Sequence, residues 1–463
     1  MKSMTAPSSK SESLRAYLCQ WLAGGAGKRI SCRTQSEDIK TMTDCLAQVD
    51  VALCSGRQRS PGDATLRDER QRSPEATPLR TDNFNLFENA GQSLLRGREA
   101  RGEREEILLD CGESGACLRF LLPVMGAFGL PCLFLRRGRL AERPIQPLAQ
   151  TLRRQGLKIS EQRTPAGESA LKIRGRLQAR SYEITASRSS QFISGLLFIL
   201  PLLQGKSAIF AQGRPVSSPY IDLTLGVLAR FGVDYHITVD KAGRCYKWKE
   251  GTFYRPLASY EPEGDWSQAA FFFIGALLAG SPLAVKGLNS HSLQGDRKIV
   301  DLLREMGADI KVRSGPSGEE IYEIYPAPLH GIFYHAEDTP DLVPPLAAAM
   351  AWAEGESRIS GVSRLREKES DRLKALDLLL TSLGVETGQR RDALYIRGSG
   401  GQRLIGQSAF HFKDHRMAMT ASILSLISEK PIFLRGSSCV NKSYPSFFDD
   451  VEALEWAGNL RID

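Results

Sequence analysis

The sequence predicts an α/β protein of six repeated units in two domains, and three observations lead to this prediction. The chain has 463 residues, which is too long for one ordinary hydrophobic core, so two domains are expected. Two kinds of helical segment alternate along it, and short β-like runs separate them. The starts of one kind recur about every 75 residues, except in a longer first unit.

Segments of the first kind are apolar on nearly all sides. Each begins at Ser or Asp, which are favourable N-caps, and most end at a Gly about four turns later. Runs such as AAFFFIGALLAG have no polar face, so these helices are expected to be buried. Pro123 and Pro201 fall inside two of them, but the regular spacing favours continuous helices at both places. The segments cover residues 9–24, 114–129, 190–205, 265–280, 341–355 and 414–430.

Segments of the second kind are amphipathic and alternate with the first. Each is about 12 residues long and has one polar face, as expected for helices of an outer layer. They cover residues 38–50, 144–156, 220–232, 295–307, 371–384 and 445–458. Together the two sets predict inner helices, outer helices and sheets that cover them.

The first unit is longer than the others because it contains an Arg-rich near-duplication. Residues 57–80 read RQRSPGDATLRDE and then RQRSPEATPLR, a composition that cannot bury a core. We expect a disordered surface insertion at about residues 55–106. Acidic residues nearly balance its Arg residues, which weakens a nucleic-acid function, although a phosphorylated or RNA-contacting arm stays open.

Composition narrows the class of protein. The net charge of +8 suits anionic ligands but does not distinguish nucleic acid, acidic lipid and small phosphates. The nine cysteines form no CxxC pair, which favours free thiols in a reducing compartment, and we expect a cytoplasmic protein. No apolar run reaches the roughly 18 residues of a membrane span, and residues 1–15 lack the apolar region of a secretion signal.

Cations and hydroxyl groups gather at the predicted helix starts. Free backbone N–H groups and the helix dipole favour anions there. If the units of a domain are related by pseudo-symmetry, these starts converge and form a site for polyanions. The cations available to it are Lys10, Arg15, Arg119, Arg143, Lys368, Arg372, Arg416 and Lys442. The six His residues lack metal-ligand spacing and no Walker loop occurs, so neither a metal nor a cofactor is expected.

The densest cluster of charges is RLREKESDRLKAL at residues 364–376. We expect a helix to begin near Ser370, with Lys368 and Arg372 close to its positive end. Two carboxylates beside cations, Asp341 and Glu369, could move protons. Asp341 could instead be a simple N-cap. His415 is expected to be a hydrogen-bonded structural residue.

Motifs at these helix starts run in order along nearly the whole chain: SKSESLR, GESGACLR, ERPI, SSQFISGLL, SSPYIDLTL, EGDWSQAAFF, QGD, PDLVP, LREKESDRL, DHRMAM and KSYPSFF. In this order they resemble the 5-enolpyruvylshikimate-3-phosphate synthase family, the 3-phosphoshikimate 1-carboxyvinyltransferases. The resemblance implies two domains of three βαβαββ repeats each, an inverse α/β barrel-like architecture. It places residues 10–262 in the N-terminal domain and residues 263–463 with 1–9 in the C-terminal domain.

The resemblance also implies a reaction. An enolpyruvyl group would pass from phosphoenolpyruvate to the 5-hydroxyl of shikimate 3-phosphate with release of phosphate, on the pathway to chorismate and aromatic amino acids. Asp341 is the candidate base at the 5-hydroxyl and Glu369 the candidate for the methylene proton, while Lys10 and Lys442 could also transfer protons. We expect these two small molecules as partners, no cofactor, no nucleic acid, no membrane and a monomer.

Positions that match the family's motifs give two sets of binding residues. For shikimate 3-phosphate they are Lys10, Ser11, Arg15, Ser189, Ser190, Gln191, Ser217, Tyr220, Asp341 and Lys368. For phosphoenolpyruvate they are Lys10, Gly115, Arg143, Gln191, Lys368, Arg372, Arg416 and Lys442.

The sequence departs from the family's pattern in places. Ser8, Glu113, Ala116 and Arg364 stand where the family usually or often has Gly, Asn, Thr and Asn, which leaves the fine substrate contacts and the response to glyphosate open. Residues 1–9 show little β character, so a short or irregular first strand is expected.

Two other functions fit parts of the sequence. The first is the related enolpyruvyl transferase that acts on UDP-N-acetylglucosamine. The loop of that enzyme carries a cysteine just before its Arg-Pro, whereas the loop of this chain reads RRGRLAERP and has no cysteine. The second is a non-catalytic relative that binds phosphate or RNA.

Overall fold

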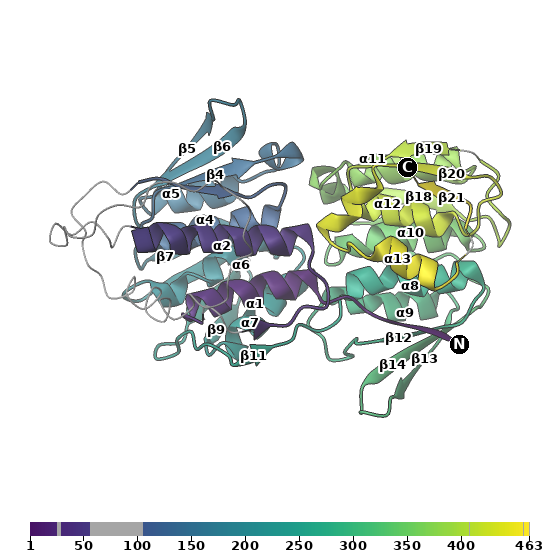
Figure 1. Cartoon of the computed structure of the whole chain (residues 1–463), viewed down its shortest axis with the longest axis horizontal. Coiled ribbons are helices and arrows are strands. Elements are labelled where there is room, and N and C mark those ends of the chain that lie inside the picture. The colour runs from purple at the N-terminus through teal and green to yellow at the C-terminus, as the bar shows by residue number, and fades with distance from the viewer. Residues whose placement is uncertain (26–28, 56–104, 407, 457, 463) are drawn as a thin grey trace, which may run out of the picture.

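The structure, a computed structural model, describes residues 1–25, 29–55, 105–406, 408–456 and 458–462. Its two halves lie side by side, with helices α1, α4 and α6 in one and α8, α10 and α12 in the other (Figure 1). The insertion expected at about residues 55–106 falls almost entirely outside the described residues. Its disorder therefore stays a prediction.

In the first half, the inner layer consists of α1 (Lys10–Leu22), α4 (Gly115–Phe128) and α6 (Ser190–Leu197). The outer helices are α2 (Glu37–Ser55), α5 (Gln146–Arg154) and α7 (Pro219–Arg230). The sheets have the strand orders β3-β4-β6-β5, β7-β8-β10-β9 and β11-β2. The strands are β2 (Arg29–Ile30), β3 (Ile107–Asp110), β4 (Cys132–Arg136), β5 (Lys158–Arg163), β6 (Ser169–Arg174), β7 (Ser181–Thr185), β8 (Ala208–Gln212), β9 (Tyr235–Val239), β10 (Gly243–Trp248) and β11 (Ser259–Tyr260).

In the second half, the inner helices are α8 (Trp266–Ala279), α10 (Val343–Trp352) and α12 (His415–Leu424). The outer helices are α9 (Ile299–Glu305), α11 (Arg372–Ser382) and α13 (Phe447–Ala453). The sheets have the orders β1-β12-β14-β13, β15-β16-β18-β17 and β19-β20-β21. The strands are β1 (Lys2–Thr5), β12 (Leu283–Lys286), β13 (Asp309–Ser314), β14 (Glu320–Tyr325), β15 (Phe333–His335), β16 (Glu356–Ser360), β17 (Glu386–Arg390), β18 (Ala393–Arg397), β19 (Ser408–His411), β20 (Ile432–Arg435) and β21 (Leu460–Ile462).

The four-stranded sheets share one pattern of pairing. In the unit β3-α4-β4-α5-β5-β6, the first two strands pair in parallel and β6 pairs antiparallel with both β4 and β5. The unit that starts at β7 repeats this arrangement. The unit that starts at β15 does so in the second half. The predicted α/β fold of repeated βαβαββ units is confirmed.

Two chain crossings join the halves. Strand β1 pairs in parallel with β12 of the second half, whereas α1 directly after it belongs to the first half. The second crossing follows β11, which pairs in parallel with β2 inside the first half. An isolated bridge joins Ser8 to Gly264 where the two crossings meet, and a Cβ on Gly264 would lie 2.4 Å from the Gly287 carbonyl oxygen. The close approach therefore needs glycine.

The first strand is short, as expected, but it is regular rather than irregular. Four consecutive residue pairs from Lys2↔Leu283 to Thr5↔Lys286 form the parallel ladder. Pairing with a buried strand of another unit overrides the weak β propensity of these residues. This pairing supports the domain boundaries given above, which stay a prediction.

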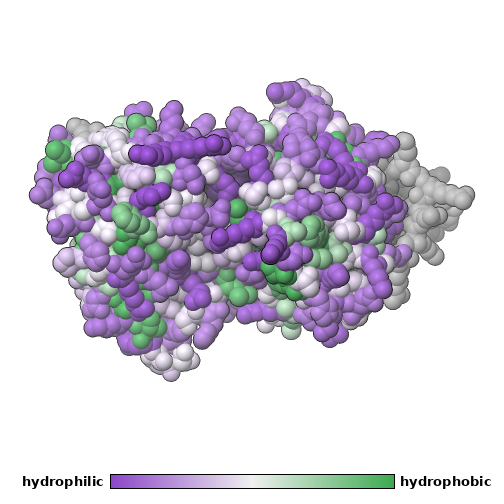
Figure 2. Space-filling view, turned by 180° about the vertical axis from the view of Figure 1, so that it is seen from behind, coloured by the Kyte–Doolittle hydropathy of each residue, from purple (hydrophilic) through white to green (hydrophobic). Residues whose placement is uncertain are grey.

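Each half has its own hydrophobic core. In α8 every residue from Trp266 to Leu278 is buried, as the absence of a polar face predicts. Phe120 and Phe198 pack edge to face in the first half with ring centroids 5.2 Å apart. On the face of the molecule shown in Figure 2, polar residues predominate and apolar side chains form small separate patches.

Proline affects the two helices differently. Helix α4 runs through Pro123, which leaves the Arg119 carbonyl without its usual helical donor. Gly195 of α6 packs against this carbonyl, since a Cβ there would lie 2.3 Å from the Arg119 oxygen. The prediction of one helix over residues 190–205 is wrong. Helix α6 ends at Leu197, and Pro201 lies in the 3₁₀ turn η3 (Leu200–Leu202).

Two predicted helix starts concern residues of the charged motifs. Helix α11 begins near Ser370 as expected, with Asp371 as its cap, and the turn η6 (Ser363–Glu367) precedes it. Asp341 is not the cap of α10, because it lies in the 3₁₀ turn η5 (Pro340–Leu342) before that helix. Among the described residues, no helix combines the length and apolar character that a membrane crossing requires.

Candidate active site

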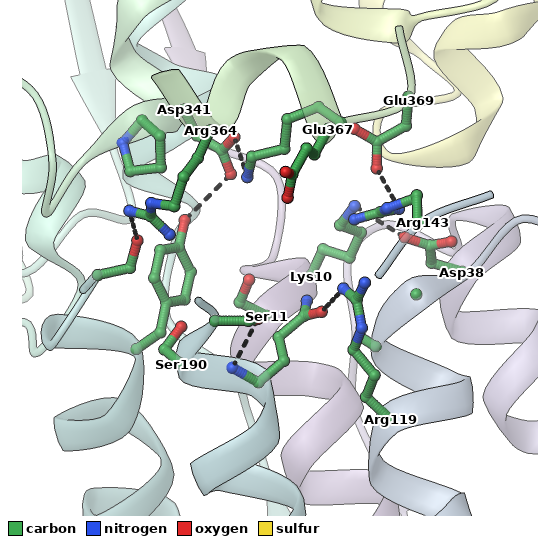
Figure 3. Close-up of a pocket in the computed structure, with 18 of the residues that line it drawn as sticks. Lys10, Ser11, Asp38, Arg119, Arg143, Ser190, Asp341, Arg364, Glu367 and Glu369 are labelled. Carbon is green, nitrogen blue, oxygen red and sulfur yellow. Dashed lines mark hydrogen bonds and ion pairs between the residues drawn. The ribbon is translucent and has the colours of Figure 1, made fainter. Parts of the chain in front are cut away.

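A polar pocket lies between the two halves (Figure 3). Helices α1, α4, α6 and α7 reach it from the first half, and η5, η6, α11 and α12 reach it from the second. Almost all the predicted site residues line it: Lys10, Ser11, Arg15, Gly115, Arg143, Ser189, Ser190, Gln191, Ser217, Tyr220, Asp341, Lys368, Glu369, Arg372 and Arg416. Lys442 is the exception, because its Nζ lies 3.2 Å from the carbonyl oxygen and 3.3 Å from Oε2 of Glu113.

Local capping explains why these side chains converge. The side chains of Ser9, Ser114 and Ser189 accept hydrogen bonds from backbone N–H groups in the first turns of α1, α4 and α6. Asp371 and Asp414 do the same for α11 and α12. Several helix N-termini therefore surround one pocket, and their dipoles favour an anionic occupant.

Arg372 organises the second-half side of the pocket. Its side chain is 1% exposed, and its guanidinium donates to three carboxylates, each at 2.8 Å: Asp341 Oδ1, Glu369 Oε2 and Asp414 Oδ2. Such charge-assisted contacts fix the carboxylates in place. The two predicted proton carriers, Asp341 and Glu369, are thus held on opposite sides of one cation.

Both carboxylates are ionised in this arrangement. Burial acts to raise the pKa of Asp341, but Arg416, Lys368 and Arg372 outweigh it and bring the pKa well below its usual range. Burial acts in the same way on Glu369, where Arg143 is the strongest of the cations that lower the pKa well below its usual range. In Lys368 burial is the dominant cause, and it lowers the pKa of the ammonium group to about 8.

The first-half side of the pocket carries further cations. Arg143 Nη1 lies 3.1 Å from Glu369 Oε1, across the two halves. Arg119 donates to Gln191 Oε1 at 2.5 Å and to the Pro144 carbonyl at 3.0 Å. A Cβ on Gly115 would lie 3.0 Å from Arg143 Nη1 and 3.2 Å from Arg119 Nη1. Glycine at this position leaves room for two guanidinium groups.

Lys10 is positioned by two acids. Its backbone N–H donates to Asp265 Oδ2 at 3.1 Å, and its Nζ lies 2.8 Å from Asp38 Oδ2 in the first turn of α2. Arg15 is tied to the protein, because it donates to Thr224 Oγ1 at 2.7 Å and to the Ser11 carbonyl at 2.6 Å. Lys10 therefore presents its ammonium group near the pocket, while Arg15 supports the wall.

Tyr220 extends from the first half to carboxylates of the second half. Its Oη lies 3.2 Å from Asp341 Oδ2 and 3.1 Å from Asp296 Oδ2. Arg364 also joins the halves, since its Nη2 donates to Ser217 Oγ of the first half at 3.0 Å, while the Glu337 carbonyl of its own half accepts from the same nitrogen at 2.6 Å. The pocket is thus closed by contacts between the halves.

The expectation for His415 is wrong in one respect. The ring is buried, but neither ring nitrogen has a hydrogen-bond partner among the described residues. Burial, with Lys10 and Arg416 nearby, lowers the pKa well below its usual value, so the imidazole is neutral. The prediction failed because the motif DHRM does not reveal that the His415 ring lies buried among cations.

Sequence reasoning missed several side chains around the pocket. Asp38, Arg188, Asp265, Ser267 and Glu367 line it. Asp296 is not in the lining, but its Oδ2 contacts the Tyr220 hydroxyl at 3.1 Å. Asp265 and Asp296 belong to the motifs EGDWSQAAFF and QGD, so the sequence contained a signal for these two residues. For Asp38 it contained none, because nothing local distinguishes this residue from other acids at helix starts. The described residues hold no group of three or more His, Cys, Asp or Glu placed to bind a metal ion.

Comparison with known proteins decides the family. The family model described as EPSP synthase (3-phosphoshikimate 1-carboxyvinyltransferase) matches residues 85–451. This chain belongs to the EPSP synthase family. A protein named 3-phosphoshikimate 1-carboxyvinyltransferase from Clostridium kluyveri is 32% identical over 462 residues, which cover 97% of this chain and 95% of the relative. The protein of that name from Clostridioides difficile is 33% identical over 461 residues, 97% of this chain and 94% of its own length.

Solved structures share the fold. A structure titled EPSP synthase from Acinetobacter baumannii has a TM-score of 0.66 and 21% identity, and the match covers 99% of this chain and 96% of that one. The enolpyruvyl transferase NikO from Streptomyces tendae has a TM-score of 0.64 and 16% identity, with coverage of 98% and 95%. The EPSP synthase fold thus extends over nearly the whole chain.

Proposed function

We propose that this chain transfers the enolpyruvyl group of phosphoenolpyruvate to the 5-hydroxyl of shikimate 3-phosphate and releases inorganic phosphate. The observation that carries the proposal is the Arg372 cluster, which holds two ionised carboxylates against a wall of cations from the other half. Membership of the EPSP synthase family over nearly the full chain supports it. The product leads towards chorismate and the aromatic amino acids.

The charges of the pocket suit two anionic substrates. Two phosphorylated substrates repel each other by roughly 4 kcal/mol per close charge pair at an effective dielectric near 20, so several cations must surround them. Arg119, Arg143, Arg372 and Arg416 offer planar donors for carboxylate and phosphate groups. Hydroxyl groups from Ser189, Ser190 and Ser217 offer neutral donors on the first-half side.

In the proposed reaction, the 5-hydroxyl oxygen forms a bond to the enol carbon of phosphoenolpyruvate. Asp341 takes the hydroxyl proton, and Glu369 delivers a proton to the methylene carbon, which becomes a methyl group. In the second step Glu369 takes a methyl proton back, the carbon–oxygen bond to phosphate breaks, and the enol ether forms. The departing phosphate takes up the proton that Asp341 accepted, so both carboxyl groups return to their starting states, and Lys10 in the pocket neutralises the charge of that phosphate.

The ion pair of Glu369 bears on its role as an acid. Without substrate, Arg143 holds Glu369 ionised. When the carboxylate or phosphate of phosphoenolpyruvate takes over Arg143, Glu369 loses that partner and its pKa rises, because its buried charge is less compensated. Substrate binding itself would thus prepare the proton donor.

The test is release of inorganic phosphate from phosphoenolpyruvate on addition of shikimate 3-phosphate. We expect release to depend on both substrates. UDP-N-acetylglucosamine offered as the acceptor should give none, in line with a loop that lacks cysteine. No release above the control without acceptor would overturn the proposal. We further propose a monomer without nucleic-acid partners or a cofactor, in the cytoplasm, with the domain boundaries given above.

A further inference from the structure

One buried carboxyl group takes no part in the reaction described above. Asp296 lies in the 3₁₀ turn η4 (Gly295–Lys298) and is 2% exposed. Its Oδ1 has no hydrogen-bond partner among the described residues, and its Oδ2 contacts the Tyr220 hydroxyl at 3.1 Å. A buried acid with a single polar neighbour requires an explanation, because an uncompensated buried charge is costly.

The number of protons available around Tyr220 supplies this explanation. Its Oη lies within 3.2 Å of both Asp296 Oδ2 and Asp341 Oδ2, but a phenol carries only one proton. Burial raises the pKa of Tyr220 well above its usual value, so the phenol keeps that proton. If both acids were ionised, one carboxylate oxygen would face the phenol oxygen with no hydrogen between them. One of the two carboxyl groups must therefore carry a proton.

The neighbours of the two acids identify which one. Asp341 has cations close by: Arg372 at 2.8 Å, Arg416 at 3.4 Å and Lys368 at 3.5 Å. No ion pair of Asp296 occurs among the described residues, and burial followed by the charge of Asp341 raises its pKa to about 7. The titratable and charged groups facing Asp296 are Tyr220 on α7, Asp265 at the start of α8, Tyr334 on β15, Asp341 in η5 and Arg416 on α12.

We infer that Asp296 is a positioning residue that carries a proton in the resting enzyme and donates it to the Tyr220 oxygen, so that the Tyr220 hydroxyl points to Asp341. The Tyr220 O–H then stabilises the ionised form of Asp341, the base of the proposed reaction. The packing fits a fixed geometry. Gly295 lets η4 approach α7, since a Cβ there would lie 2.7 Å from Pro219 Cγ.

The catalytic consequence of this inference rests on the proposed function, but the protonation of Asp296 does not. An infrared difference spectrum between the wild type and Asp296→Asn, recorded without substrates near pH 6, should contain the band of a protonated carboxyl group that the variant loses. The matched control is Asp301→Asn, an exposed acid close by in the chain, which should leave the band unchanged. Absence of the band would overturn the inference even if the enzyme turns over.

Kinetics distinguish this role from a merely structural one. Asp296→Asn keeps an N–H donor for Tyr220, so kcat near pH 6.5 should stay within about threefold of the wild type, whereas Asp296→Ala should lose about tenfold. In kcat/KM the wild type should begin to decline near pH 7, and Asp296→Asn only near pH 8, where Lys368 loses its proton. Equal losses in both variants, or superimposable pH profiles of wild type and Asp296→Asn, would contradict the inference.

The two proposals can fail separately. If phosphate release is absent but the carboxyl band is present, the proposed function fails and the protonation of Asp296 stands. If Asp296→Ala does not fold, Asp296→Asn still supplies both measurements. In a Tyr220→Phe background, Asp296→Asn should have no further effect on kcat, because the group that links the two acids is gone. A full additive effect there would count against a path through Tyr220.

Discussion

Arg143 of the first half and Glu369 of the second half form an ion pair, with Arg143 Nη1 3.1 Å from Glu369 Oε1. Both side chains are largely buried, with 9% and 12% exposure. The pair joins the two halves at the point where the proposed reaction needs a proton donor and an anion-binding cation. Several testable consequences concern this pair and its neighbours.

Replacing Glu369 by Gln should lower kcat by about two to four orders of magnitude, the range of general acid–base catalysis, with substrate binding largely kept. Steady-state kinetics and equilibrium binding of shikimate 3-phosphate measure the two effects. The matched control is Glu386→Gln, which removes an exposed carboxylate outside the pocket that lies 3.7 Å from Arg397. Turnover like that of the wild type in Glu369→Gln would remove Glu369 from the chemistry.

Substituting Gly115 by Ala should raise KM for phosphoenolpyruvate by about tenfold and change kcat less. The new methyl group would lie 3.0 Å from Arg143 Nη1, so the guanidinium must move, and overpacking of this kind costs about 1–3 kcal/mol. Gly388→Ala is the control, because the nearest atom to its Cβ is 3.8 Å away in Tyr395. Equal KM values for the wild type and Gly115→Ala would show that the space is not needed.

The pH dependence of substrate capture should reflect Lys368. Burial lowers the pKa of this ammonium group to about 8, so the charge is present below pH 8 and lost as pH rises through it. Because the substrates are anions, kcat/KM should decline on the alkaline side of this value. In Lys368→Arg the charge persists, and this part of the decline should disappear from the profile. A decline unchanged in that variant would assign it to another group.

Truncating Arg364 to Ala should raise KM for shikimate 3-phosphate by about tenfold with kcat within about threefold, because the lost contacts hold the halves together in ground and transition states alike. Arg364 Nη2 donates to Ser217 Oγ at 3.0 Å and to the Glu337 carbonyl at 2.6 Å. Arg391→Ala, at an exposed position, serves as the control. A loss confined to kcat would instead indicate a role specific to the transition state.

Much of the fold could be predicted from the sequence because burial leaves a strong periodic signal. Helix α8 is buried from Trp266 to Leu278, mostly by apolar residues, and is capped by Asp265 and Gly280, and both ends agree with prediction. The prediction of one helix over residues 190–205 failed because a local effect, the proline at 201, outweighed the periodic pattern. Strand β1 is short, as expected, but its regular pairing could not be predicted because the partner strand β12 is distant in sequence.

The candidate site was predictable where a residue sits inside a motif at a helix start. Lys10, Arg143 and Arg372 are examples, and the structure brings them to one pocket. Asp296 escaped prediction although it belongs to the motif QGD, because its importance depends on a tyrosine from another unit. The protonation of such a residue depends on all its neighbours in space, and no local pattern encodes them.

The pairing of β1 with β12 of the second half sets an order for folding during translation. Residues Lys2–Thr5 leave the ribosome long before Leu283–Lys286, the strand with which they pair. The first half can complete its own sheets once Ser259–Tyr260 has emerged and joined Arg29–Ile30. Until Leu283–Lys286 has also emerged, β1 lacks β12, so its edge is exposed to other chains. The second half therefore cannot complete the sheet that contains β1 until more than half of the chain has been made.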